Sequence, residues 1–422
     1  MKKTNAINTL YDHIDSLEVG QVQQYKNMEV MPLYSDKKST LDYLVLEDAM
    51  DRKGFNIKET GNVNILDVYN KNNKDVLIIK GEYVVGGKQN RMVSVNGLVG
   101  KKKKKKIQLP VHCIEQGRWN TPGNFYAGKV AAAGMRHGLT KDFSGSKGQQ
   151  QTWAEVSHKL HGTGVESRTA NFDDFYKVNQ KSIDDYVGNF KSKRGQVGFI
   201  VAITNMWGHK EFYMDMFDKP KTMKKHHTRM LESYATEAIE NKTVHPRLGA
   251  LPPDSMIHKD TKSTQRLAMN FLDRIKEGYA TTSRSLDKGI DIEISNEPMY
   301  EIMLEKARKK FHPNRLTCDD GFVPEGPHNI SPNIARYPDP HMFPHNMPKL
   351  NGSGLVLDDT IVYFGASEQQ TKIHYPHPRP VPPRPPIGPG PVIPYYPMPG
   401  IRHSRDIYWN EDLTCDDDDT PK

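Results

Sequence analysis

The stretch VGFIVAITNMWGHKEFYMDMF, residues 197–217, has the pattern of two strands joined by a turn. Residues 197–203 are a continuous apolar run, which predicts a buried β-strand. Residues 205–208 have the composition of a turn, and residues 211–217 are predicted to be the second strand of a hairpin. The segment therefore indicates a pair of antiparallel strands, of which the first is buried.

Helices are predicted on both sides of this hairpin in the sequence. Amphipathic stretches at residues 149–160 and 172–186 precede it. Apolar residues at helical spacing predict two further helices, at residues 222–240 and 263–278. A last hairpin is expected within residues 354–365.

The N-terminal half of the chain is strand-rich. One helix is expected between Ser39, which can cap it, and Gly54, which ends it. From residue 55 to residue 119 the apolar period changes to two, which predicts a meander of β-hairpins. The predicted fold class is therefore α+β: a strand-rich antiparallel N-terminal half packed with several helices, plus a disordered or partner-bound Pro-rich C-terminal extension.

Changes of composition along the chain predict five regions. Residues 1–24 are a polar lead-in, residues 25–284 an α+β globular domain, residues 285–350 an irregular insertion, residues 351–370 the closing hairpin of the globular domain, and residues 371–422 a Pro-rich low-complexity tail.

The tail cannot build a core of its own, because twelve prolines fall between Pro376 and Pro399 and delete backbone donors. Residues 371–410 nevertheless keep many apolar and aromatic side chains, which a pure linker does not need. We expect this segment to dock on a protein partner or on a neighbouring copy in a homo-oligomer.

Composition limits the class of protein. The 422 residues carry a net charge of +8, which permits an anionic partner without requiring one. No apolar run approaches the roughly 18 to 20 residues that a membrane span needs, so no membrane partner is expected. The N-terminus lacks the apolar segment of a signal peptide, and three widely spaced cysteines do not suggest a disulfide framework. A cytoplasmic location is therefore predicted.

The densest group of functional side chains lies in VLIIKGEYVVGGKQNRMVSVNGLV, residues 76–99, and in IQLPVHCIEQGRW, residues 107–119. Glu82 and Glu115 are candidate catalytic carboxylates, because a glutamate can act as a base or bind ribose hydroxyls. An arginine offers a fork for phosphate, and amide side chains can read a base or ribose. The candidate ligand-binding residues are Gln89, Asn90, Arg91, Arg118 and Trp119. The competing interpretation is that these arginines and glutamates form structural salt bridges within a sheet.

Other chemistry is not supported. His112 and Cys113 are adjacent on a predicted strand and point to opposite faces, so a buried, inert cysteine is favoured over a nucleophile. Neither a GxGxxG nor a GxxxxGK[ST] phosphate motif occurs, and His226-His227 has no partner motif for metal. We assign no metal and no cofactor.

A run of six lysines, Lys101, Lys102, Lys103, Lys104, Lys105 and Lys106, lies in a predicted turn between two strands. Such a run is usually a solvated loop. A nucleic-acid contact is the sharper alternative, although no nucleic-acid-binding motif accompanies the run.

The order GE…GGKQNR…PVHCIEQGRW, followed by a helix with Trp153, by QVGFIVAI…EFYMDMFDKP and by LESYATEAI, resembles a known family. This prokaryotic and phage family is named for its association with ADP-ribosylglycohydrolases and rhodanese-like phosphatases. The resemblance covers roughly residues 25–280 and returns around residues 354–365. It implies a link to ADP-ribose and NAD-derived metabolism but no established catalytic residue. The matching positions are Glu82, Gln89, Asn90, Arg91, Glu115, Arg118 and Trp119.

Three functions remain open from the sequence. The leading one is a cytosolic protein that binds an ADP-ribose or NAD-related nucleotide. Processing of the bound nucleotide is an extension of this hypothesis. The first alternative is an assembly or scaffold protein whose Pro-rich tail docks on a neighbouring chain. The second alternative is a nucleic-acid-binding module that uses the lysine run. We expect Glu82, Gln89, Arg91, Glu115 and Arg118 to converge in one cleft if the leading function is right.

Overall fold

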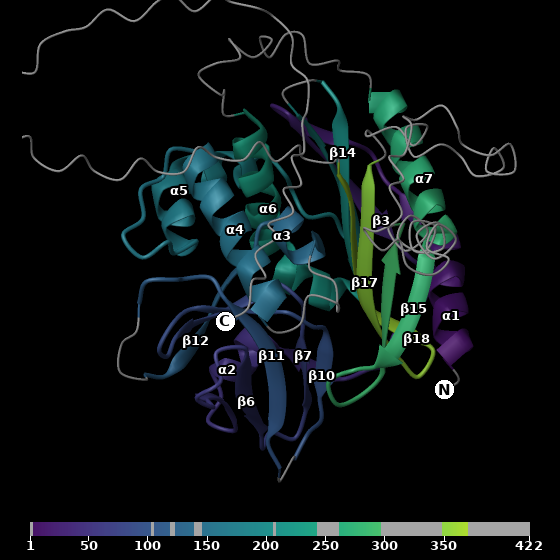
Figure 1. Ribbon diagram of the computed structural model, residues 1–422. Coiled ribbons are helices and arrows are strands. Elements are labelled where there is room, and N and C mark those ends of the chain that lie inside the picture. The colour runs from purple at the N-terminus through teal and green to yellow at the C-terminus, as the bar shows by residue number, and fades with distance from the viewer. Residues whose placement is uncertain are drawn as a thin grey trace, which may run out of the picture. The chain divides into compact units, whose positions relative to one another are not determined.

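The computed structural model describes residues 3–102, 105–118, 123–138, 146–205, 208–242, 261–296 and 348–369. The chain divides into two compact units, residues 1–372 and 373–422, and every described residue belongs to the first. Helices and mainly antiparallel strands are mixed in this unit, which confirms the α+β class (Figure 1). The Pro-rich tail lies outside the described residues, so its docking on a partner stays a prediction.

A nine-stranded antiparallel sheet, which we call the large sheet, forms the centre of the unit. Its main path runs β1 (Glu18–Val19), β3 (Met28–Tyr34), β13 (Gly198–Thr204), β14 (Lys210–Phe217), β18 (Thr360–Gln369), β17 (Lys349–Leu357), β16 (Ile290–Ser295), β15 (Tyr279–Arg284), and β2 (Gln23–Tyr25) pairs with β3. The hairpin predicted from residues 197–217 is β13 with β14, in which Ile200 lies opposite Met214. The predicted closing hairpin is β17 with β18.

Helices cover both faces of the large sheet (Figure 1). Helices α1 (Lys3–Asp15) and α7 (Thr261–Glu277) lie on one face, and α6 (Pro220–Lys242) lies on the other. The alternation along β14 explains this arrangement, because successive strand residues point to opposite faces. Met214 and Met216 join the core beneath α1 and α7, whereas Tyr213 and Phe217 join the core beneath α6.

Three more helices extend the α6 side of the sheet. They are α3 (Ala133–Gly138), α4 (Ser146–Gly162) and α5 (Asp173–Gly188), and α5 packs against α6. The rings of Phe172 and Phe175 stack within this core, and Tyr176 meets both of them edge to face. The helices predicted at residues 149–160, 172–186, 222–240 and 263–278 are therefore confirmed as α4, α5, α6 and α7.

Residues 43–130 form a second β-structure, which we call the small lobe. A six-stranded path runs β12 (Phe125–Val130), β8 (Glu82–Gly86), β9 (Arg91–Val93), β11 (Ile107–Cys113), β6 (Ile65–Asn70), β5 (Phe55–Glu59). A three-stranded path runs β10 (Gly97–Val99), β7 (Asp75–Ile78), β4 (Tyr43–Val45), with β4 parallel to β7. The two ends of the longer path, β12 and β5, also touch, so the sheet curls round a valine- and leucine-rich core. The predicted meander is confirmed in its antiparallel hairpins.

Two predictions about the N-terminal region are wrong. The polar lead-in is helix α1, because Ala6, Leu10 and Ile14 recur every four residues and bury one stripe against the large sheet. The helix expected from Ser39 to Gly54 is reduced to α2 (Leu46–Met50). The residues before α2 instead form β4, because β7 offers an open edge for them.

The insertion expected at residues 285–350 is not irregular throughout. Residues 290–295 form β16, which pairs with β15 on one side and β17 on the other. Its buried residues Ile292 and Ile294 alternate with polar ones, and this period-two pattern continues the sheet. Residues 297–347 lie outside the described part of the chain. The domain boundaries themselves stay predictions.

Candidate functional site

The two polar segments of the predicted site meet at one end of the small lobe. Residues 86–91 join β8 to β9, and residues 113–118 leave the end of β11. They meet because β9 pairs with both neighbours: Arg91 lies opposite Val84 of β8 and opposite Cys113 of β11. This pairing brings together Gln89, Asn90, Arg91, Glu115 and Arg118.

Arg118 fastens the two segments to each other. Its Nε donates to Oε2 of Glu115 at 2.8 Å, and one terminal nitrogen donates to Oδ1 of Asn90 at 2.9 Å. The same guanidinium also donates to the backbone carbonyls of Gly86 and Gly87. With so many protein acceptors, Arg118 has the contacts of a structural residue.

Glu115 is buried and its two carboxylate oxygens are occupied. Besides Arg118, Oε2 accepts the backbone N–H of Asn90 at 3.3 Å, and Oε1 accepts the Thr169 hydroxyl at 3.2 Å. Little hydrogen-bonding capacity is left for a substrate. For Glu115 the geometry therefore favours the salt-bridge interpretation over that of a general base.

Arg91 is the member of the cluster whose hydrogen-bonding capacity is not filled. The residue is 1 % exposed, yet its Nε has no partner among the described residues. One terminal nitrogen donates to Oε1 of Gln89 at 3.3 Å, and the other lies 3.7 Å from Oε1 of Glu59. A buried guanidinium normally has shorter and more numerous acceptors. Arg91 therefore keeps donors that the described part of the chain does not satisfy.

Cys113 lies beside Arg91 but is not activated by it. Burial raises the pKa of the Cys113 thiol to about 11, which outweighs the opposite effect of the Arg91 charge. The thiol donates to Oε1 of Gln89 at 3.1 Å. Nδ1 of His112 points elsewhere, 3.0 Å from the Thr152 hydroxyl on α4. The prediction of a buried, unreactive cysteine with its neighbouring histidine on the other face is supported by this geometry.

Glu82 does not join the other site candidates. Its carboxylate accepts the backbone N–H of Ile79 at 3.0 Å and pairs with Arg229 at 3.2 Å and with His226 at 3.6 Å. Burial alone would raise the pKa of Glu82, but the bond from His226 and the charge of Arg229 lower it. Convergence is wrong for this residue, because side chains of α6, far away in the sequence, fix its direction.

Gly86 and Gly87 are required by packing at this point. Both have positive φ, at 117° and 54°. A Cβ on Gly86 would lie 2.2 Å from the backbone oxygen of Asn124, and one on Gly87 would lie 2.3 Å from the Phe125 ring. These glycines therefore let the 86–91 loop close on the β12 strand, where any side chain would force it open.

Two sequence candidates are wholly or partly outside the described residues. Trp119 is one, and Lys103 and Lys104 of the lysine run are others. Lys106 pairs with Asp67 at 2.7 Å, so that end of the run is locally neutralised.

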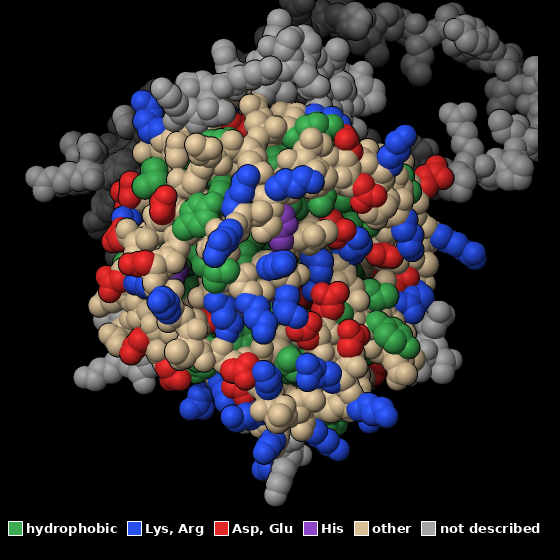
Figure 2. All heavy atoms as spheres, turned by 180° about the vertical axis from the view of Figure 1, so that it is seen from behind, with side chains coloured by type: hydrophobic (Ala, Val, Ile, Leu, Met, Phe, Trp, Pro, Cys, Tyr) green, Lys and Arg blue, Asp and Glu red, His purple; other side chains and the backbone are tan. Residues whose placement is uncertain are grey.

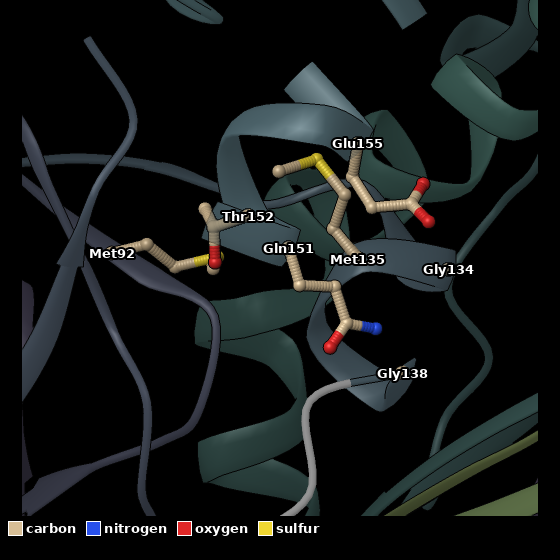
Figure 3. A pocket seen from close by; sticks show the side chains of 7 residues that line it. All are labelled: Met92, Gly134, Met135, Gly138, Gln151, Thr152 and Glu155. Carbon is tan, nitrogen blue, oxygen red and sulfur yellow. The ribbon is translucent and has the colours of Figure 1, made fainter. Parts of the chain in front are cut away.

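A small cavity lies on the opposite face of β9 from Arg91. It measures about 20 Å³, which is room for about one water molecule. Figure 3 shows Gln151 and Glu155 of α4 beside Met92 and Met135. Oε1 of Gln151 is buried without a hydrogen-bond partner among the described residues, which suits an ordered water there. The cavity was not anticipated from the sequence and is too small for a nucleotide.

A buried ionic network between α3, α6 and the large sheet was not predicted from the sequence. Arg136 forms a double ion pair with Asp215, with nitrogen–oxygen distances of 2.7 and 2.6 Å. The hydroxyls of Tyr234 and Tyr363 donate to the same carboxylate. Asp215 was visible as an acid in an otherwise apolar strand, but its partner on α3 had no sequence signal.

No group of three or more His, Cys, Asp or Glu side chains in the described part of the chain is arranged to hold a metal ion. None of the helices described combines the length and apolar character that crossing a membrane requires.

Comparison with known proteins identifies the family. A family model described as the ARG and Rhodanese-Phosphatase-superfamily-associated Protein domain, ARPP-1, matches residues 16–315. The chain belongs to this family. The ARPP-1 match takes in the small lobe with both polar segments of the candidate site, and it ends before β17 and β18. No curated protein and no solved structure matches the chain.

Proposed function

We propose that this protein binds an ADP-ribose or NAD-related nucleotide at the end of the small lobe, with Arg91 as the residue that receives a phosphate. The observation that carries the proposal is the buried guanidinium of Arg91, whose Nε has no partner among the described residues. The family name, which links ARPP-1 domains to ARG proteins, supports the choice of nucleotide. The proposal includes a cytoplasmic location, in keeping with the three widely spaced cysteines.

The electrostatics of the Arg91 site favour an anion. Placing a guanidinium out of water costs several kcal/mol, about what a close carboxylate with good geometry returns. Glu59 is 3.7 Å away, too far to return much of it, and its oxygen also accepts the backbone N–H of Lys88 at 2.9 Å. A phosphate oxygen would give Arg91 the short, charge-assisted bonds that Glu59 does not provide.

Binding requires Glu59 to move aside. Its side chain, at the end of β5, is 11 % exposed, whereas that of Arg91 is 2 % exposed. In the proposed bound state a phosphate replaces the Glu59 carboxylate as the partner of Arg91, and the amides of Gln89 and Asn90 lie beside it. We propose binding only, because the carboxylates of Glu82 and Glu115 are held by protein donors.

Titration calorimetry of the full chain with ADP-ribose, NAD and AMP tests the proposal. Arg91→Gln should weaken binding by about 1.5 to 3 kcal/mol, the range for hydrogen bonds to charged groups. Glu59→Gln should strengthen it, since it removes the carboxylate that competes with phosphate. Arg274→Gln is the matched control, because Arg274 pairs with Glu368 on the large sheet. Absence of heat with all three nucleotides, or an unchanged affinity for Arg91→Gln, would contradict the proposal.

A further inference from the structure

We propose that one end of the large sheet carries a nucleic-acid-binding surface, separate from the Arg91 site. This basic face is made of Lys37 and Lys38, Lys193 and Arg194, and Lys221 and Lys224. Its ligand would be the phosphate backbone of DNA or RNA, and its recognition would not depend on base sequence. The inference does not rest on nucleotide binding at Arg91.

The pairing of the strands brings the three segments of the basic face together. In the large sheet Gly198 lies opposite Leu33 of β3 on one side and opposite Met216 of β14 on the other. Residues 35–38, 191–196 and 218–221 therefore all leave or enter the sheet at the same end. Correspondingly, a Cβ built on Gly195 would lie 4.0 Å from the Tyr34 ring.

Lysine and arginine side chains gather across the middle of one side of the molecule (Figure 2). All six side chains of the basic face are exposed. Among the described residues, no carboxylate lies within ion-pair distance of any of them. Neighbouring lysines are instead paired with carboxylates: Lys225 pairs with Asp48, and Lys74 pairs with Asp42. The positive charge of the basic face is therefore free to act on a partner.

Asp42, an acidic residue at the margin of the basic face, is affected by the same positive charge. The pKa of the exposed Asp42 carboxyl is lowered first by its hydrogen bond from Lys74, and also by the charges of Lys219 and Lys221. Lys219 is itself held in place over the Tyr43 ring, with its nitrogen 4.3 Å from the ring centre. The positive field thus extends from the start of α6 towards the small lobe.

The chemistry of the basic face fits nucleic acid better than a membrane. The large hydrophobic residues that are exposed in the described chain are Tyr126, Val178, Met269 and Tyr279, and none lies in the three segments. A surface without apolar anchors cannot insert into a bilayer. The cations also come from three separate segments and do not surround one cradle, which suits a row of phosphates rather than a single one.

The lysine run at residues 101–106 is the alternative location for the same partner, and it provides the control. Lys106 is paired with Asp67, and a neighbouring acid, Asp75, accepts the backbone N–H of Lys101 and pairs with Lys288. Two variants of equal charge change separate the locations. One replaces Lys193, Arg194, Lys221 and Lys224 by Gln, and the other replaces Lys101, Lys102, Lys105 and Lys106 by Gln.

The experiment measures fluorescence anisotropy of labelled 30-nucleotide DNA and RNA, single-stranded and duplex, with the full chain over a range of salt. We expect binding at low salt by the natural chain. The basic-face variant should bind at least about tenfold more weakly. It should also flatten the slope of log K against log salt by about 0.9 for each duplex phosphate that the variant no longer neutralises. The lysine-run variant should bind as the natural chain does.

Three outcomes would overturn the inference. They are no binding of any nucleic acid at low salt, loss of binding only in the lysine-run variant, and equal losses in both variants. Phosphatidylserine vesicles are the comparison polyanion, and a preference for them over nucleic acid would also overturn it. Replacement of the three lysines by Arg keeps the charge and should keep the affinity. Together with unchanged melting of both Gln variants, it separates loss of charge from loss of fold.

Discussion

The small lobe and the large sheet each bury an arginine to the same degree, but the two arginines have very different partners. Arg136, beneath the large sheet, is 1 % exposed and meets Asp215 through two short bonds, with Tyr363 and Ser233 as further partners. Arg91, in the small lobe, is also 1 % exposed, but its described partners are one neutral acceptor and a carboxylate 3.7 Å away. Equal burial therefore does not mean equal function.

Arg136 is a buried charge with a close counter-charge, whereas Arg91 is a buried charge whose nearest carboxylate is distant. The cost of burying an ion is best offset when its partner is close and its polar atoms are paired, as are all three guanidinium nitrogens of Arg136. The same ion is destabilising when its partners are few, and such departures from good pairing are expected at functional or strained sites. Removing the partners of each arginine one at a time tests whether the two differ in their contribution to stability.

The largest effect is expected for Asp215→Asn. The substitution keeps the shape of the side chain but leaves the Arg136 guanidinium buried without a counter-charge. We expect the free energy of unfolding to fall by about 3 to 5 kcal/mol, measured by urea denaturation. Tyr363→Phe is the matched control, since it removes one neutral hydroxyl, which donates to Asp215 and accepts from Arg136, and should cost about 1.5 kcal/mol, the low end for hydrogen bonds to charged groups. Similar losses for the two variants would show that the charge of Asp215 is not what holds this region.

A smaller loss is expected for Arg118→Gln at the edge of the small lobe. This change removes the charged partner of Glu115, which is itself almost completely buried. Because Arg118 is partly exposed, we expect a loss of about 1.5 kcal/mol, the low end for hydrogen bonds to charged groups. Lys177→Gln on the exposed face of α5 is the control and should change stability by at most about 0.5 kcal/mol. No difference between the two variants would remove the structural assignment of Arg118.

Acid should weaken the region around Arg136 through its neighbour His137. Burial lowers the pKa of His137 well below 6.5, and the charges of Arg136 and Lys80 lower it further. Below pH 6.5 the unfolded chain therefore binds a proton at this position that the folded chain does not bind. The free energy of unfolding should fall as the pH drops through 6.5, with a slope that approaches about 1.4 kcal/mol per pH unit well below it.

Urea denaturation at pH 7.5, 6.5 and 5.5 measures this slope, with His137→Gln as the comparison. His13, whose pKa burial lowers to about 4, contributes a slope of the same sign in both proteins. The free energy of unfolding of the variant should therefore depend on pH less steeply than that of the natural chain, by the contribution of one titrating group. Equal slopes for the two proteins would show that His137 is not held neutral by the fold.

The contrast between the two arginines was only half visible in the sequence. The hairpin of residues 197–217 and the meeting of the 86–91 and 113–118 segments could be predicted, because antiparallel pairing follows from apolar periods and turn residues. The direction of Glu82 could not, since Arg229 and His226 reach it from a helix far along the chain. The number of partners around a buried arginine is likewise a tertiary property. The helical spacing of Ala6, Leu10 and Ile14 was a signal that the polar appearance of residues 1–24 concealed.

The smallest effect on stability is expected for Arg91→Met, and it is the most informative result. Methionine replaces the apolar methylene stem of the arginine side chain, adapts to irregular space through its flexible thioether, and carries no charge to desolvate. The contacts with Gln89 and Glu59 give Arg91 little stabilisation. Exchanging this poorly paired buried ion for an apolar side chain should therefore leave the free energy of unfolding unchanged within about 1 kcal/mol, or raise it.

Arg136→Met is the matched control, because it strands the carboxylate of Asp215 in the core and should cost about 3 to 5 kcal/mol. Denaturation without nucleotide and with saturating ADP-ribose completes the design. Ligand that binds only the folded chain raises its stability, so the natural protein should gain from ADP-ribose, and Arg91→Met should gain little. If Arg91→Met were as damaging as Arg136→Met in the absence of nucleotide, Arg91 would be a structural residue after all. An arginine that can be removed without harm to the fold, but not without harm to binding, is kept in the small lobe for its ligand.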